Sequence, residues 1–407
     1  MAYAFDLGSP ATNANPFPEF ARLRAEDPVH WSPAMKAWIV TRYADVKQVA
    51  LNNRQISADR LTPFFKSNPE YQKGTIDSLV RYLNHWMVFR DPPDHTRLRR
   101  LFNKAFTPTS VENLRANVED IVGHLIDGMQ AKAARGETVD YIADFAYPLP
   151  ASVIMDLLGV PRADLESVKH WSDDIALFIG SAQVAGNKYL RAESGAKAMS
   201  GYFRTLVEDR TAQPRDDMIS QLVLARDDRD ALNTDEIIGT CILLLFAGHE
   251  TTTNLIGNGF LYSMKHRAQW ERLVADPTLA APAVEEFLRY DGPSGALARV
   301  ASADLEMNGK TIRAGQRVFA FVNAANRDPE AFDEPERFDV GRAQNPHLTF
   351  GHGIHFCLGA PLARLEAQIA ATRLAERLPH IRLSGGDPDW HDSLILRGVK
   401  RLPVQLA

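Results

Sequence analysis

The sequence predicts a mainly α-helical protein with a small β region, and three observations support this fold class. Apolar residues recur at helical spacing along most of the chain, and the stretch 234–264 carries an apolar core typical of a buried central helix. Strand patterns are confined to two short regions, 29–41 and 305–322. No repeat, low-complexity stretch or Gly/Ser linker divides the chain, so we expect residues 1–407 to form a single domain.

The composition narrows the possible functions. The net charge of −5 argues against nucleic-acid binding, because phosphate contacts need a basic surface. The 2 cysteines, far apart in sequence, form neither a disulfide framework nor a tetrahedral zinc or iron–sulfur site, and indicate a reducing compartment. No signal-like apolar run follows the N-terminus, and the longest apolar stretch, Ile237–Phe246, is too short to span a bilayer. We therefore expect a cytoplasmic protein without a membrane segment.

The N-terminal third is expected to alternate short helices and strands. His95 and Arg99 lie four residues apart on a predicted helix that begins at Asp91–Asp94, where an acidic cap candidate and two prolines stand, and ends near 105–108. They therefore share one helical face, and the alternative is an ordinary solvated face. The other elements expected here are a helix at Pro18–Asp27, strands at Val29–Trp31 and Ala37–Thr41, a helix at Tyr43–Asn52 and a long, partly helical loop at 57–84.

The longest helix is expected at 234–264. Asn233 and Glu236 have capping-box spacing, with Asn in place of the usual Ser or Thr. The apolar core that follows is broken at Ala247–Thr253, where an acid and several hydroxyls are costly to bury without partners. Threonine can also bond back to the carbonyl four residues earlier, so a simple kink is the alternative to a functional site. Upstream, helices are expected at Val111–Ala134, at Leu149–Leu158 and as two patterns within 164–209, whose break near 180–186 would suit a mobile lid.

The last third of the chain is expected to hold the clearest β region and two further helices. Leu305–Met307 and Lys310–Arg313 flank Asn308-Gly309, a dipeptide typical of a type I′ hairpin turn. Arg299 lies at the entrance to this region. The other expected elements are a strand at Val318–Val322 and helices at 281–290 and Leu358–Leu378, the last of which is stopped by Pro379.

Cys357 lies on a glycine-rich loop directly before the last predicted helix. Backbone N–H groups and the positive end of the helix dipole favour the thiolate over the thiol at such a place. Gly351 and Gly353 make the loop pliable, and Gly359 allows a flat group to approach the backbone. A thiolate presented in this way is what a haem iron needs as an axial ligand. The alternative for a lone cysteine is a small buried hydrophobic residue.

The loop as a whole resembles a known family signature. The phrase Phe350-x-x-Gly353-x-His355-x-Cys357-x-Gly359 is similar to the haem-binding signature of the cytochromes P-450, with each expected residue present. The resemblance implies the fold of that family, with a long central helix and a haem-binding cysteine loop. It also implies haem b (iron protoporphyrin IX) as cofactor and Cys357 as its metal ligand. The further haem contacts that it implies are Phe350, Gly351 and Gly359 in the loop and His95, Arg99, Arg299 and His355 on the two propionates, although Arg299 can equally be a strand-edge cation.

Two other segments extend the resemblance. Ala247–Thr253 resembles the oxygen-activation motif of the same family, in which the central helix widens locally. Glu286-x-x-Arg289, followed by Pro335–Phe338, resembles the Glu–Arg–Arg network that braces the cysteine loop, with Arg337 as its third member. The implied activity is that of a monooxygenase that inserts one atom of O2 into a C–H bond, by hydroxylation or dealkylation. Thr251 would then position oxygen and an ordered water, and Glu250 would relay protons from solvent.

The substrate pocket is expected to be apolar, so we expect a small or medium apolar organic substrate. The alternative for every residue assigned to it is ordinary core packing. The assigned residues are Trp86, Met87 and Val88 in the loop before the helix at 91, Phe178 near the lid, Leu244 and Ala247 on the central helix, and Gly295, Ala296 and Leu297.

Electrons are expected to come from an external ferredoxin and an NAD(P)H-dependent ferredoxin reductase. The chain has no Gly-x-Gly-x-x-Gly fingerprint and no cysteine quartet, and therefore no flavin or iron–sulfur domain of its own. A basic patch near the cysteine loop would favour docking of an acidic ferredoxin. The candidate cations, for which ordinary solvated side chains are the alternative, are Arg97, Arg100, Lys104 and Arg364.

Two other functions are compatible with the same fold. A peroxygenase that uses hydrogen peroxide directly would not need the acid–alcohol pair, so Glu250 and Thr251 argue against it. A non-catalytic haem-binding partner protein would be marked by loss of the ligand cysteine, and Cys357 is present. A monooxygenase is therefore the leading hypothesis.

Overall fold

Helices form most of the structure, as the sequence predicted. The computed structural model describes residues 9–180, 187–227 and 230–406, with 59% helix and 11% strand. Contacts divide the chain into two units, each of which is described by itself. The first unit comprises residues 1–56, 115–150 and 250–407, and the second comprises 57–114 and 151–249. The expectation of a single domain stays a prediction. No helix within the described ranges is long and apolar enough to cross a membrane.

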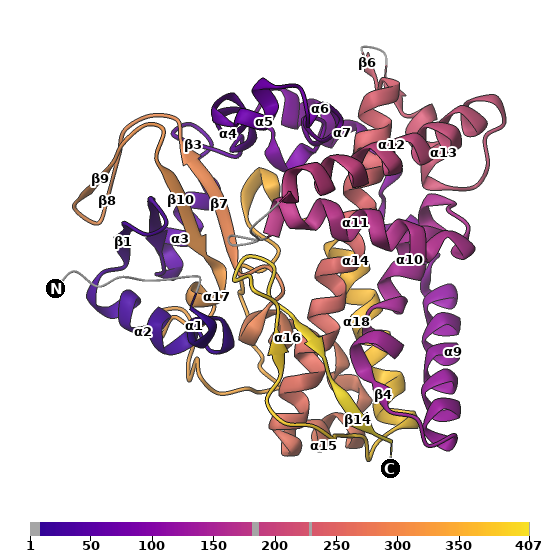
Figure 1. Cartoon of the computed structure of the whole chain (residues 1–407). Helices are drawn as coiled ribbons and strands as arrows, with labels where there is room; N and C mark the ends of the chain where they lie inside the picture. The colour runs from indigo at the N-terminus through magenta and orange to yellow at the C-terminus, as the bar shows by residue number, and fades with distance from the viewer. Residues whose placement is uncertain (1–8, 181–186, 228–229, 407) are drawn as a thin grey trace. The chain divides into compact units, whose positions relative to one another are not determined.

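A mixed sheet forms one part of the first unit (Figure 1). Strand β2 (Ala37–Val40) pairs antiparallel with β1 (Val29–Ser32) and parallel with β10 (Arg317–Phe321), which pairs antiparallel with β7 (Ala296–Ala301). The partnership of β2 with β10 joins strands some 280 residues apart, and neither strand's own pattern identifies its partner.

The hairpin of β8 (Leu305–Met307) and β9 (Lys310–Ile312) confirms the predicted turn. Asn308 and Gly309 have φ of 48° and 70°, as a type I′ turn requires.

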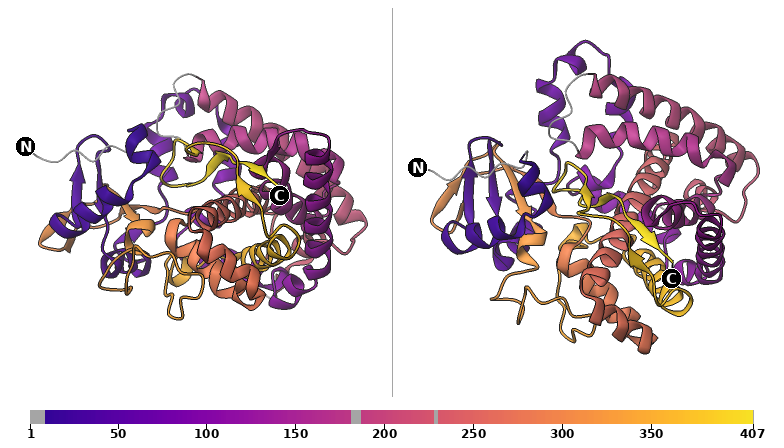
Figure 2. Two further views of the ribbon diagram at one scale, coloured as in Figure 1. Left: turned by 90° about the horizontal axis from the view of Figure 1, so that it is seen from below. Right: turned by 60° about the horizontal axis from the view of Figure 1, so that its bottom comes forward.

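Long helices form the other part of the first unit. Helix α18 (Ala360–Arg377) packs against α9 (Arg115–Ala134), α15 (Arg267–Ala275) and α16 (Ala280–Asp291), and α9 lies beside α18 in both views of Figure 2. The shorter elements of the described chain here are α1 (Pro10–Ala14), α2 (Phe17–Glu26), α3 (Tyr43–Leu51), β3 (Ile56–Ser57), β4 (Val139–Asp140), η2 (Ile142–Ala146), η4 (Pro277–Leu279), α17 (Val322–Ala325), η5 (Gly353–His355), β11 (Arg382–Leu383), β12 (Asp389–Trp390), β13 (Val399–Arg401) and β14 (Pro403–Gln405).

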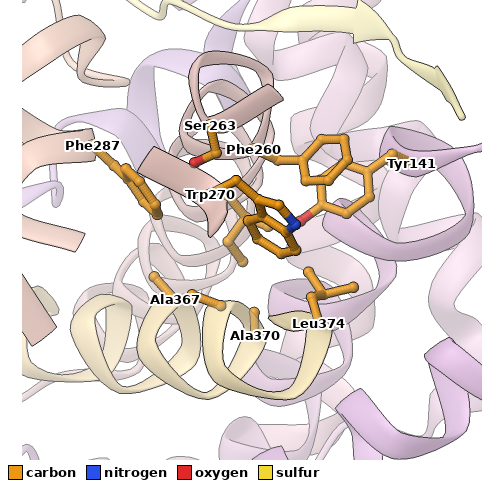
Figure 3. Close-up of a pocket in the computed structure, with 10 residues that line it drawn as sticks. Tyr141, Phe260, Ser263, Trp270, Phe287, Ala367, Ala370 and Leu374 are labelled. Carbon is orange, nitrogen blue, oxygen red and sulfur yellow. The ribbon is translucent and has the colours of Figure 1, made fainter. Parts of the chain in front are cut away.

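A small cavity remains among these helices (Figure 3). Its volume is about 20 Å³, which is just enough for one water-sized molecule. Ala367, Ala370 and Leu374 of α18 line one side of it, and the rings of Tyr141 and Trp270 lie across from them. The cavity lies in the helical core, and none of its ten lining residues belongs to the predicted substrate pocket.

The second unit is built around a pair of antiparallel helices, α11 (Leu165–Gly180) and α12 (Lys188–Ala212) (Figure 1). Gly195 allows their close approach, because a Cβ there would lie 2.7 Å from the carbonyl oxygen of Trp171. The predicted lid lies largely at 181–186, outside the described residues. The loop expected at 57–84 contains three short helices. These helices are α4 (Leu61–Ser67), α5 (Pro69–Gln72) and α6 (Asp77–Leu83). The other elements of this part are η1 (Met87–Phe89), α7 (Asp94–Ala105), α8 (Pro108–Glu112), α10 (Pro148–Leu158), η3 (Arg162–Asp164), α13 (Met218–Leu224), β5 (Arg226–Asp227) and β6 (Asp230–Ala231).

The central helix α14 (Thr234–Lys265) has 32 residues, close to the predicted span. Its capping box is present: the Glu236 N–H donates to Asn233 Oδ1 at 3.0 Å, and the Asn233 N–H donates to Glu236 Oε2 at 2.9 Å. The residues up to His249 belong to the second unit and those from Glu250 onward to the first.

Candidate functional site

The cysteine loop owes its shape to two glycines. Gly351 and Gly353 have φ of 74° and 70°, in the left-handed region that other residues rarely adopt. A Cβ on Gly353 would also lie 3.2 Å from the Leu51 side chain, which would have to shift slightly, so the positive φ is the main reason for glycine at this position. The loop closes on itself through the Cys357 N–H, which donates to the Phe350 carbonyl oxygen at 2.8 Å. Helix α18 begins three residues after the cysteine.

The two cysteines differ in their surroundings. Cys241 is fully buried within α14, and desolvation raises the pKa of its thiol, which therefore stays protonated. Cys357 is only partly buried and precedes a helix N-terminus. Only Cys357 is therefore placed to act as a thiolate ligand.

A buried ion network lies beside the cysteine loop in the first unit. The Arg289 side chain donates from Nε and Nη2 to the Glu286 carboxylate at 2.7 and 2.8 Å, and both side chains are 0% exposed. Arg342 Nε adds a further bond to Glu286 at 3.1 Å, and the Asp339 N–H adds one at 2.9 Å. We call Glu286, Arg289 and Arg342 the brace.

Arg337 does not take the predicted third place in this network. Its guanidinium pairs with the exposed Glu334 at 2.8 Å, and only its backbone carbonyl enters the network, as acceptor from Arg289 at 3.0 Å. The chain direction at this point turns the Arg337 side chain outward, and Arg342 reaches Glu286 instead. The spacing of the motif alone could not distinguish these two arginines.

The polar segment of α14 continues the helix without interruption. Glu250 and Thr251 are half-buried, and Thr252 and Thr253 are buried. The Glu250 carboxylate acts on His391 of the C-terminal segment: desolvation lowers the pKa of that imidazole, and the negative charge of Glu250 opposes the shift. His391 was not predicted as a neighbour, because nothing in its local sequence points to α14.

The four predicted propionate contacts are divided between the units. His95, which is buried, and Arg99, which is half-buried, lie one turn apart on α7 in the second unit. In the first unit, His355 lies in η5 and Arg299 in β7, where Arg299 Nη1 donates to the Ala298 carbonyl oxygen at 2.9 Å. The shared helical face predicted for His95 and Arg99 is therefore present, and the propionate role of all four stays a prediction.

The predicted pocket residues of the second unit fall into two groups. Trp86 and Met87 are buried, and Trp86 stacks on Phe89 with ring centroids 5.8 Å apart. Phe178 stacks on Phe65 at 5.7 Å, so both tryptophan and phenylalanine have packing partners. The more exposed group comprises Val88, which is 41% exposed, and the α14 residues Leu244 and Ala247.

The predicted pocket residues of the first unit precede or begin β7. Ala296 is buried and Leu297 is half-buried. A Cβ on Gly295 would lie 2.0 Å from the Leu394 carbonyl oxygen, so Gly295 is required for close approach of two backbone segments.

The cations expected to dock a redox partner are paired with carboxylates. Arg97 contacts Asp230 at 2.9 Å and also Glu236, while Arg100 lies 3.9 Å from Asp230. Arg364 binds Glu285 through two hydrogen bonds of 2.7 and 2.8 Å. The side chain of Lys104 lies outside the described residues. Each of the three arginines therefore has a carboxylate partner, and their role in docking a redox partner stays a prediction.

Comparison with known proteins identifies the family. A model described as Cytochrome P450 matches residues 29–400. A biotin biosynthesis cytochrome P450 of Bacillus subtilis is 38% identical over 408 residues, covering 99% of each chain. The cytochrome P450 monooxygenase PikC of Streptomyces venezuelae is 40% identical over 409 residues, covering 98% of this chain and 94% of that protein. The crystal structure of P450BioI in complex with hexadec-9Z-enoic acid ligated acyl carrier protein matches with a TM-score of 0.89 at 38% identity, covering 98% and 99% of the two chains.

Proposed function

Because this chain belongs to the cytochrome P450 family, we propose that it is a haem b monooxygenase. It would insert one atom of O2 into a C–H bond of a small or medium apolar substrate, by hydroxylation or dealkylation. The family carries haem, and one of the relatives named above is a monooxygenase. The observation that carries the proposal is Cys357, a partly buried thiol on a tightly folded loop before α18. Thiolate ligation is the property that distinguishes this class of haem protein from other oxygen-binding ones.

The residues of the described chain fit a haem group. A Cβ on Gly359 would meet nothing within 4 Å, so the backbone two residues after Cys357 borders open space that a flat ring could use. On α14, which is otherwise largely buried, Ala247 is exposed and Leu244 is half-exposed, and these are apolar side chains that suit contact with a porphyrin. Cys357 would hold the iron, and His95, Arg99, Arg299 and His355 would hold the propionates.

Bound haem would activate dioxygen, and side chains of α14 would deliver the protons that the reaction consumes. Reduction of dioxygen consumes two protons for each oxygen atom inserted. The Thr251 hydroxyl can orient a water molecule by hydrogen bonding, and the Glu250 carboxylate, half-buried one residue earlier, can carry protons from solvent to it. His391 lies within the electrostatic reach of Glu250 and offers a second titratable group on the same route.

External proteins complete the reaction. We infer that electrons come from a ferredoxin and an NAD(P)H-dependent ferredoxin reductase, since the chain carries no flavin or iron–sulfur motif. The relatives differ in the substrates that their names imply, so the family does not identify a substrate. One structural neighbour was crystallised with a fatty acyl chain on an acyl carrier protein, which makes carrier-bound acyl chains one class to test.

Isotope labelling tests this proposal. Compounds that shift the haem iron from low to high spin are first selected from a panel of free and carrier-bound apolar molecules. The selected compound is then turned over under ¹⁸O2 with a surrogate ferredoxin, ferredoxin reductase and NADPH. We expect one ¹⁸O atom in a hydroxylated product, or one in the carbonyl fragment that a dealkylation releases. Product formed with hydrogen peroxide but not with the reductase system would identify a peroxygenase, and spin shifts without any product would contradict catalysis.

A further inference from the structure

A second ion cluster lies next to the brace but faces the cysteine loop. The Glu285 carboxylate, from α16, accepts two hydrogen bonds from Arg364 of α18 and lies 3.0 Å from His347 Nε2. Partial burial alone would raise the pKa of Glu285, but the hydrogen bonds and charges of Arg364 and His347 outweigh it and lower that pKa to about 2. The carboxylate is therefore ionised throughout the neutral range. We call Glu285, His347 and Arg364 the loop clamp.

The loop clamp holds the ring of Phe350. The Arg364 guanidinium carbon lies 4.5 Å from the centroid of the Phe350 ring, which is cation–π distance. The His347 ring lies 5.9 Å from the same ring. The carbonyl of Phe350 in turn accepts the hydrogen bond from the Cys357 N–H at 2.8 Å. A continuous set of contacts thus runs from the Glu285 carboxylate to the backbone of the cysteine.

We propose that the loop clamp is a positioning cluster for the haem site, in which Arg364 and Glu285 fix the Phe350 ring and thereby set the reduction potential of the iron held by Cys357. The inference rests on the proposed function. Partners that orient a ligand and control the polarity around it tune the potential of a metal site. The clamp is suited to this role because its two charges cancel while its guanidinium lies over the Phe350 ring.

Folding stability alone gives a weaker account of the same contacts. The side chains of Arg364 and Glu285 are 31% and 27% exposed, and ion pairs with such exposure contribute little to folding stability. The brace, one residue further along α16, is 0% exposed at both Glu286 and Arg289 and already anchors this helix. The loop clamp is therefore better placed to act on the loop than to hold the fold together.

Single replacements separate positioning from charge. Arg364→Gln removes the cation and the guanidinium over the ring, whereas Arg364→Lys keeps the cation but loses the planar guanidinium and its two-pronged bond to Glu285. A matched control is Arg373→Gln on the same helix, where the arginine binds Glu119 and Glu376 at 3.0 and 3.1 Å.

The test is a spectroelectrochemical titration of the haem-loaded variants. We expect Arg364→Gln to lower the equilibrium constant for iron reduction by about two- to fivefold, the range of one exposed cation–ring contact. Arg364→Lys should show at least half of the same decrease, because the lysine cannot hold the ring in place. Arg373→Gln should have the reduction potential of the wild type. In a Phe350→Leu background, Arg364→Gln should have no further effect, because the ring through which it acts is gone.

Each contrary result has a distinct meaning. Full recovery by Arg364→Lys, or an equal shift in the Phe350→Leu background, would show that charge alone acts and would overturn the positioning role. Potentials equal to that of the control would overturn the inference while leaving the proposed function intact. Absence of haem from the wild-type protein would instead overturn the proposed function, and with it this inference.

Discussion

The brace and the middle of α14 differ in whether their buried polar groups have hydrogen-bond partners. In the brace, the Glu286 carboxylate receives hydrogen bonds from two arginines and one backbone N–H, so a charge removed from water is fully compensated. In α14, the buried hydroxyl of Thr253 has no hydrogen-bond partner within the described ranges. The brace therefore has the contacts of a structural element, whereas the α14 segment holds the two residues, Glu250 and Thr251, to which we assign proton delivery.

Breaking the brace is expected to have the largest effect on stability. Arg289→Met leaves the Glu286 carboxylate buried without its main partner, and we expect a loss of about 3–5 kcal/mol in the free energy of unfolding, measured by urea titration. Arg337→Met is the matched control, because that side chain is 54% exposed and pairs with Glu334 and Asp339 and not with Glu286. Its expected cost is within about 0.5 kcal/mol. An equal loss of unfolding free energy in the two variants would show that the Arg337 side chain is part of the network around Glu286 after all.

Thr251→Ala tests the other region. We expect it to leave stability and haem content unchanged but to lower product formed per NADH oxidised by about tenfold, because proton delivery loses its orienting hydroxyl. Thr252→Ala is the control, since Thr252 is its buried neighbour on the same helix. Full coupling in Thr251→Ala would remove the residue from the mechanism.

Two carboxyls, Glu285 of α16 and Glu366 of α18, predict opposite dependences of stability on pH. The pKa of Glu285 is lowered in the folded protein, so its contribution is present above the ordinary carboxyl pKa and is lost as the pH falls toward about 2. Burial in α18 raises the pKa of Glu366 well above its ordinary value, so its contribution is present in acid and is lost as the pH rises through the folded pKa.

Thermal unfolding across pH distinguishes these two groups. Glu285→Gln should remove part of the acid-side loss of stability, and Glu366→Gln should raise the melting temperature most on the alkaline side. The opposite pattern would contradict the assigned directions.

The smallest effect is expected from filling the cavity in Figure 3. Ala370→Cys adds one heavy atom, which is about what the cavity can hold, and should stabilise the protein by about 0.5 kcal/mol. Ala363→Cys, on the same helix but outside the cavity lining, should change stability by less. Destabilisation by Ala370→Cys would show that the core has no room to adjust.

Local patterns predicted much of the fold and of the site. The capping box at Asn233, the turn at Asn308-Gly309 and the glycines around Cys357 each depend on residues within a few positions of one another. Their physical causes are local, so the sequence carries them directly.

The remaining features depend on long-range contacts. Arg342 reaches Glu286 across 56 residues and Arg364 reaches Glu285 across 79, and the course of the intervening chain decides which arginine arrives. Asp91 likewise was expected to cap α7, but its carboxylate accepts hydrogen bonds from Ser57 and from the Ala58 N–H. Residue spacing in a single sequence does not predict such long-range hydrogen bonds.

The assignment of Cys357 as iron ligand is tested most directly by the absorption spectrum of the reduced protein under carbon monoxide. Cys241→Ala serves as control, because that thiol is buried within α14 and its pKa is raised. The account predicts that the wild type and Cys241→Ala share the red-shifted band of a thiolate-ligated haem, and that Cys357→Ala lacks it. An unchanged band in Cys357→Ala would contradict the assignment.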